Sequence, residues 1–66
     1  MTLNDEIMDF SKDLAEQRIL NDPTDTEIVQ AVSEYVNINL HPNSVGARLA
    51  VATYNRYDLE GMVNAA

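Results

Sequence analysis

Residues 3–16 read LNDEIMDFSKDLAE, and the spacing of apolar side chains in this stretch predicts an amphipathic helix. Four apolar residues recur one helical turn apart, so that at about 100° of rotation per residue they share one narrow stripe. They are Leu3, Ile7, Phe10 and Leu14. We therefore expect this stripe to face the core and the rest of the helix to face solvent.

A row of carboxylates lies on the flank of the same helix, well round from the apolar stripe. We call it the acidic ribbon, and it consists of Glu6, Asp9, Asp13 and Glu16. Acids one turn apart repel each other, and beyond the first turn the helix dipole compensates little. A solvated face of an acidic protein is the simplest explanation of the row. A surface that docks onto a Lys/Arg-rich protein is the sharper one.

Composition supports a basic protein as partner. The chain has 66 residues, no Cys and a formal net charge of −7, which fits a single acidic helical domain over 1–66. Such a charge disfavours direct binding to nucleic acid or to an anionic membrane, and favours encounter with basic proteins. No cationic leader and no long apolar run are present, so we expect a cytoplasmic protein with no membrane contact.

Two prolines, Pro23 and Pro42, separate further helical segments. The second segment, 24–40, begins with a capping box of Thr24 and Glu27 and is apolar over a wide arc, which predicts a central helix. A homodimer would cover the excess apolar surface. The alternation in residues 36–40 also suits a short strand.

The third segment, 44–55, places Val45, Leu49 and Ala52 on one side, and its small residues Gly46 and Ala50 allow a close helix approach. A continuous helix beyond residue 55 would put Arg56 on the Val45 face. We therefore predict a break near Asn55 and a separate short helix over 58–64.

Together these patterns predict an all-α fold, a small three-helix bundle over 3–19, 24–40 and 44–55 with a possible short fourth helix at the C-terminus. The predicted core is Leu3, Ile7, Phe10, Leu14, Ile28, Val32, Tyr35, Val36, Leu49, Ala52 and Val63.

No catalytic set, metal site or cofactor motif can be assembled from the sequence, so we expect no enzyme activity. His41 is the only His and is interpreted as a loop residue. Tyr54, Arg56 and Tyr57 cluster near the C-terminus and are candidate partner anchors, since Tyr and Arg are frequent in binding hot spots.

Two stretches, SEYVNINLHPNS (33–44) and TYNRYDLEGMV (53–63), resemble parts of the small acidic helical immunity proteins that neutralise bacterial nuclease toxins. The resemblance covers about a third of the chain without a specific motif, so no residue roles are carried over. The intervening VGARLAVA (45–52) departs from their very short third helix. The resemblance implies only that an acidic helical inhibitor of a basic protein has a precedent.

The leading hypothesis is a non-enzymatic inhibitor or regulator that occupies a basic surface on a protein partner, of the phage type that small mobile genetic elements often encode. The ribbon, Tyr54, Arg56 and Tyr57 would bind that partner. Alternatives are a nucleic-acid mimic and a self-associating structural subunit. A helix-turn-helix that reads DNA through Arg48, Asn55 and Arg56 is opposed by the net charge of −7.

Overall fold

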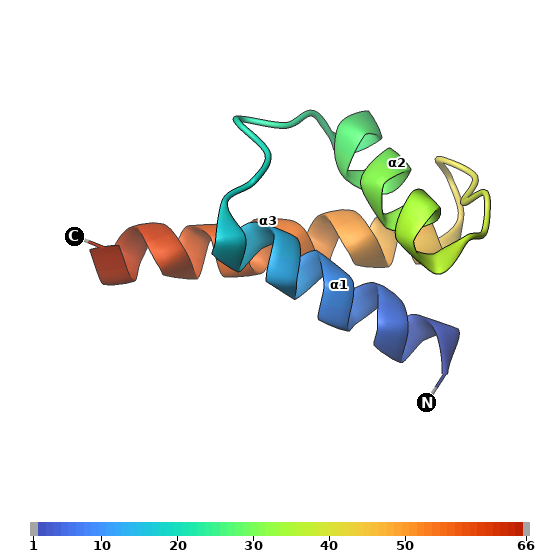
Figure 1. The fold of residues 1–66 in the computed structure, drawn as a ribbon, viewed down its shortest axis with the longest axis horizontal. Helices are drawn as coiled ribbons and strands as arrows, with labels where there is room; N and C mark the ends of the chain where they lie inside the picture. Colours follow the sequence, from blue (N-terminus) through green and yellow to red (C-terminus); the bar gives the residue numbers. More distant parts are fainter. Residues whose placement is uncertain (1, 66) are drawn as a thin grey trace.

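Three helices make up the fold. The structure, a computed structural model, describes the backbone of residues 2–65 and the side chains of residues 2–60. The helices are α1 (Leu3–Gln17), α2 (Asp25–Val36) and α3 (Val45–Ala65), as Figure 1 shows. The described residues contain no strand, so the all-α class is confirmed and the strand interpretation of residues 36–40 is wrong.

Side chains satisfy the first backbone N–H groups of each helix. Thr2 and Asp5 form a capping box at the start of α1. Thr24 and Glu27 form the predicted capping box at the start of α2. The N–H of Ala47 donates to Ser44 Oγ over 3.1 Å, which caps α3. The carboxylate of Glu27 is thus held by its own helix.

Left-handed residues end the first two helices. Arg18 (φ 53°) follows α1, and its N–H donates to the carbonyl of Leu14. Asn37 (φ 57°) follows α2, and the N–H of Ile38 donates to the carbonyl of Ser33, in the manner of a Schellman motif. α2 therefore ends four residues before the predicted bound, because the asparagine turns the chain out of the helix.

The third helix is continuous through Asn55, so the predicted break there is wrong, and no separate fourth helix is present in the described residues. The prediction assumed that Val45 faces the core, but its side chain is 74% exposed. α3 instead buries the face that carries Ala47, Ala50 and Tyr54, which leaves Arg56 in solvent. The continuous helix also departs from the short third helix of the immunity proteins.

The most extensive helix contact is the one between α1 and α3, not one that involves α2, so the prediction of a central middle helix is wrong. Small side chains fill the buried faces of this pair: Ser11, Ala15, Ala47 and Ala50. Such residues let two helix backbones approach closely. At Gly46 a Cβ atom would lie 3.3 Å from Ile7 Cδ1 and 3.1 Å from Leu40 Cδ2. The space at Gly46 is therefore too small for a larger side chain without a shift of Ile7 or Leu40.

The core differs in part from the predicted one. The buried apolar residues are Ile7, Leu14, Ala15, Ile28, Val29, Val32, Leu40, Ala47, Ala50 and Tyr54. Phe10, Val36 and Leu49 pack against them while partly exposed. The assignments of Leu3, Tyr35 and Ala52 to the core are wrong, because these side chains are exposed. Val63 lies outside the described side chains.

The error on α1 has a geometric cause. The buried face is Ile7, Ser11, Leu14 and Ala15. It is rotated round the helix axis from the predicted stripe, toward the small residues that contact α3, and Leu3 is thereby left at its edge. The rotation turns the acidic ribbon still more directly away from the core.

Candidate functional site

The acidic ribbon lies on the solvent face of α1. All four of its carboxylates are exposed, and on a helical wheel they fall opposite Ile7, Ser11 and Ala15, which are buried. The Phe10 ring, at the border between the two faces, is only partly exposed. α1 is thus an amphipathic helix whose outer surface is anionic over about 15 Å of its length.

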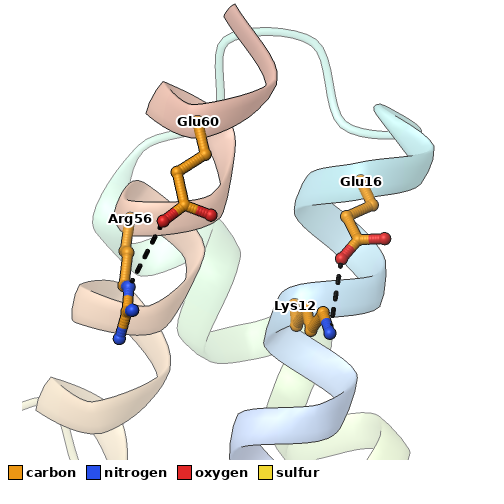
Figure 2. Close-up of polar contacts among 4 residues, drawn as sticks. All are labelled: Lys12, Glu16, Arg56 and Glu60. Carbon is orange, nitrogen blue, oxygen red and sulfur yellow. Dashed lines mark ion pairs between the residues drawn. The ribbon is translucent and has the colours of Figure 1, made fainter. Parts of the chain in front are cut away.

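One end of the ribbon is partly neutralised. Lys12 Nζ lies 3.8 Å from Glu16 Oε1, and the same ammonium group is 5.2 Å from the centre of the Tyr57 ring (Figure 2 shows the ion pair). Both side chains of the pair are about half exposed, so the pair is weak. The other three acids, Glu6, Asp9 and Asp13, form no ion pair with any described residue.

A second ion pair lies on α3, beside the pair of Lys12 and Glu16. Arg56 Nε is 3.6 Å from Glu60 Oε1, and the guanidinium is 5.5 Å from the centre of the Tyr57 ring (Figure 2). The half-buried Tyr57 therefore has two cations within range of a cation–π contact, one from each helix. This cluster joins the carboxyl half of the ribbon to α3.

The predicted anchors thus fall into two groups. Arg56 is exposed and Tyr57 half-buried, and both lie at the end of the ribbon that holds Lys12 and Glu16. Tyr54 is only 3% exposed and packs in the core. Burial, reinforced by the Asp58 carboxylate and opposed by Arg18, raises the pKa of the Tyr54 phenol above its ordinary value. Tyr54 is therefore a neutral core residue in this structure.

Sequence reasoning missed a groove between α2 and α3 with a volume of about 740 Å³. Its apolar wall includes Val29, Leu40 and Val51, and two carboxylates, Asp25 and Glu34, lie on its α2 side. The available signal was the wide apolar arc of α2, which was interpreted as a sign of a central helix. The apolar residues of α2 instead contribute both to the core and to the wall of this groove.

His41 lies in the connection between α2 and α3, as predicted, and its Nδ1 accepts a hydrogen bond from the N–H of Asn43 over 3.1 Å. Within the described side chains, no three His, Asp or Glu residues gather in a way that could hold a metal ion.

Over the part of the chain that the structure describes, no helix combines the length and the apolar character needed to cross a bilayer. Comparison with protein-family models, with curated proteins and with solved structures found no match to this chain.

Proposed function

We propose that the protein is a non-enzymatic binding module whose acidic ribbon occupies a basic surface on a protein partner, so that it acts as an inhibitor or regulator of that partner. The observation that supports this most directly is the position of Glu6, Asp9 and Asp13. They are exposed, lie opposite the core and have no cationic partner among the described residues. An unneutralised row of this kind costs helix stability through mutual repulsion, and a Lys/Arg-rich partner would remove that cost.

The ribbon is fixed before the partner arrives. Its neighbouring carboxylates are about 5–6 Å apart at their Cβ atoms, on a helix capped at both ends and packed along α3. A preorganised row of charge speeds encounter and sets the orientation of the complex. Arg56 and Tyr57, at the Lys12 end of the ribbon, would add polar and aromatic contacts at the edge of the interface.

The proposal is tested by affinity capture from a lysate of the source organism, with mass spectrometry of the captured proteins. We expect a basic protein that is retained at low salt and released as the salt concentration rises. A bait with Glu6→Lys, Asp9→Lys and Asp13→Lys should lose this protein while its circular dichroism and melting curve remain those of a folded helical protein. Equal capture by the reversed bait would remove the ribbon from the interface.

Self-association is a second candidate, favoured by the outer face of α3. Val45 is 74% exposed and Leu59 is 60% exposed, and Ala52, midway between them at a seven-residue spacing, is also exposed. This spacing is that of a helix pair. Sedimentation at micromolar concentration would show a dimer that Val45→Glu with Leu59→Glu dissociates, whereas a monomer at every concentration would exclude this function.

A further inference from the structure

We infer that the groove between α2 and α3 is a second contact site, which receives a short amphipathic segment of the partner whose apolar side chains are flanked by Lys or Arg. The inference rests on the proposed function for one point, that the partner is a basic protein. Exposed charges contribute more to encounter and orientation than to net binding energy. The groove would therefore supply much of the affinity that the ribbon does not.

The size and the lining of the groove suit apolar side chains. Its volume of about 740 Å³ lies in the range typical of binding sites, about 300–1,000 Å³. Val29 and Leu40 form buried parts of its wall, Val51 is partly buried, and the exposed Ala52 lies on its α3 side. Pro42, from the connection between the two helices, also lines it. Several aliphatic side chains of a partner would be removed from water here.

The charges on the groove select a cationic segment. Asp25 and Glu34 line it from the two ends of α2, nine residues and therefore about 14 Å apart along the helix axis. Both are exposed, and neither forms an ion pair with a described residue. A segment of about two and a half helical turns with a cation at each end spans the same distance along its axis.

Because of Arg48, the partner segment needs apolar side chains as well as cations to bind in the groove. Arg48 lines the groove from α3, whereas the two carboxylates line it from α2. A purely basic peptide would be attracted by α2 and repelled by Arg48, so charge alone gains little at this site. A segment that places apolar side chains between its cations can use the wall of the groove and keep its charges on the α2 side.

The net charge argues against a second copy of the chain as the occupant. Two copies that met at this groove would bring together chains of formal net charge −7 each, with their acidic α2 sides at the contact. The attraction of a basic segment has the opposite sign. A dimer that protects the groove residues in solution is therefore an outcome that would overturn the inference.

The groove and the ribbon are separate surfaces. No residue of α1 lines the groove. α1 meets α2 on another side, where the Phe10 ring stacks on Tyr35. Contacts at the two sites can therefore be followed by different residues in one experiment.

The test is a titration of the isotopically labelled full chain, followed by backbone amide NMR shifts, with two synthetic peptides. One is acetyl-KLLKKLLK-amide, which is cationic and amphipathic, and the other is octalysine, which is only cationic. We expect the amphipathic peptide to shift the amides of Val29, Leu40, Val51 and Ala52, and octalysine to leave them unshifted. Amide shifts in α1 separately report binding of a peptide at the acidic ribbon.

A pair of matched variants tests the location. Ala52→Trp places a large side chain at the groove, at a position outside the core. It should lower the affinity for the amphipathic peptide by about tenfold or more. Ile19→Trp, at an exposed position in the connection between α1 and α2 that does not line the groove, should leave the affinity unchanged.

Equal affinity for the two Trp variants would overturn the inference. So would shifts confined to α1, and that result would leave the proposed role of the ribbon standing. Shifts in the groove without any in α1 would support the inference and remove the ribbon from the proposed function.

Discussion

The ring of Phe10 on α1 stacks on the ring of Tyr35 on α2, with the ring centres 3.9 Å apart and the planes 3° from parallel. The contact lies at the surface, since Tyr35 is 64% exposed. It links the first two helices at the border of the buried face of α1. The stack thereby helps to hold the rotation of α1 that turns the acidic ribbon outward.

Loss of this stack should weaken the fold measurably. Tyr35→Ala is expected to lower the free energy of unfolding by about 1 kcal/mol, the typical contribution of an aromatic pair. Tyr35→Phe keeps both rings and should unfold like the parent chain. Urea unfolding of the two variants checks this, and equal stability of Tyr35→Ala and the parent would show that the stack contributes nothing.

Replacement of Ser11 by alanine should increase the stability of the fold. Its side chain is fully buried, and its hydroxyl has no hydrogen-bond partner among the described residues, which costs free energy. Alanine is also the better helix former. Ser11→Ala should therefore stabilise the fold by about 1 kcal/mol, which in a domain of this size raises the melting temperature by about 4–8 °C.

Ser44→Ala is the matched control, because it removes a hydroxyl that caps α3. It should destabilise the fold by about 1 kcal/mol. Thermal unfolding of both Ser→Ala variants would thus give shifts of opposite sign. A fall in melting temperature for Ser11→Ala would show that its hydroxyl has a partner in solution.

Gly46 should tolerate no branched side chain. A Cβ at this position would already press on Ile7 and Leu40, so Gly46→Val overpacks the contact between α1 and α3 and should cost about 1–3 kcal/mol. Gly46→Ala adds one carbon that helix propensity partly offsets, so its effect should be smaller. Denaturant midpoints of the two variants provide the comparison, and equal midpoints would contradict the close approach.

Alkaline pH should destabilise the protein through Tyr54. Its pKa is raised in the folded state above the ordinary 10.0, so the fold favours the neutral phenol. The corresponding stability is complete below pH 10.0 and is lost as the pH rises above that value, where the unfolded state releases its proton first. Tyr54→Phe should show a smaller loss of melting temperature between about pH 9 and pH 11. An identical loss in both proteins would contradict the burial of this phenol.

Local signals in the sequence predicted the helices better than their packing. The capping box of Thr24 and Glu27 was predicted because it depends only on residues three apart. The end of α2 was missed because Asn37 adopts the left-handed conformation. An asparagine in a sequence does not by itself show that it will do so. Capping is a local property, whereas the choice between continuing and ending a helix depends on which face is buried.

The candidate site could be predicted in part. The placement of the ribbon on an exposed face follows from helical spacing alone, and its four carboxylates are exposed. Tyr54 was misplaced because an aromatic residue beside Arg56 looks the same in sequence whether its ring is buried or exposed. The groove could not be predicted, since it depends on how α2 meets α3.

The central claim is that the ribbon binds through the position of its charges and not merely through the net charge of the chain. The most direct measurement is a calorimetric titration of the captured basic partner with two variants that change the net charge of −7 by the same amount. One neutralises the ribbon through Glu6→Gln, Asp9→Asn and Asp13→Asn. The other adds lysines at exposed positions elsewhere, through Asn21→Lys, Asn43→Lys and Asn55→Lys.

We predict that the neutralised ribbon weakens binding by about tenfold or more, and that the added lysines change the affinity by less than about threefold. Equal losses of affinity in the two variants would show that only net charge matters. Unchanged affinity with the neutralised ribbon would contradict the proposed function outright.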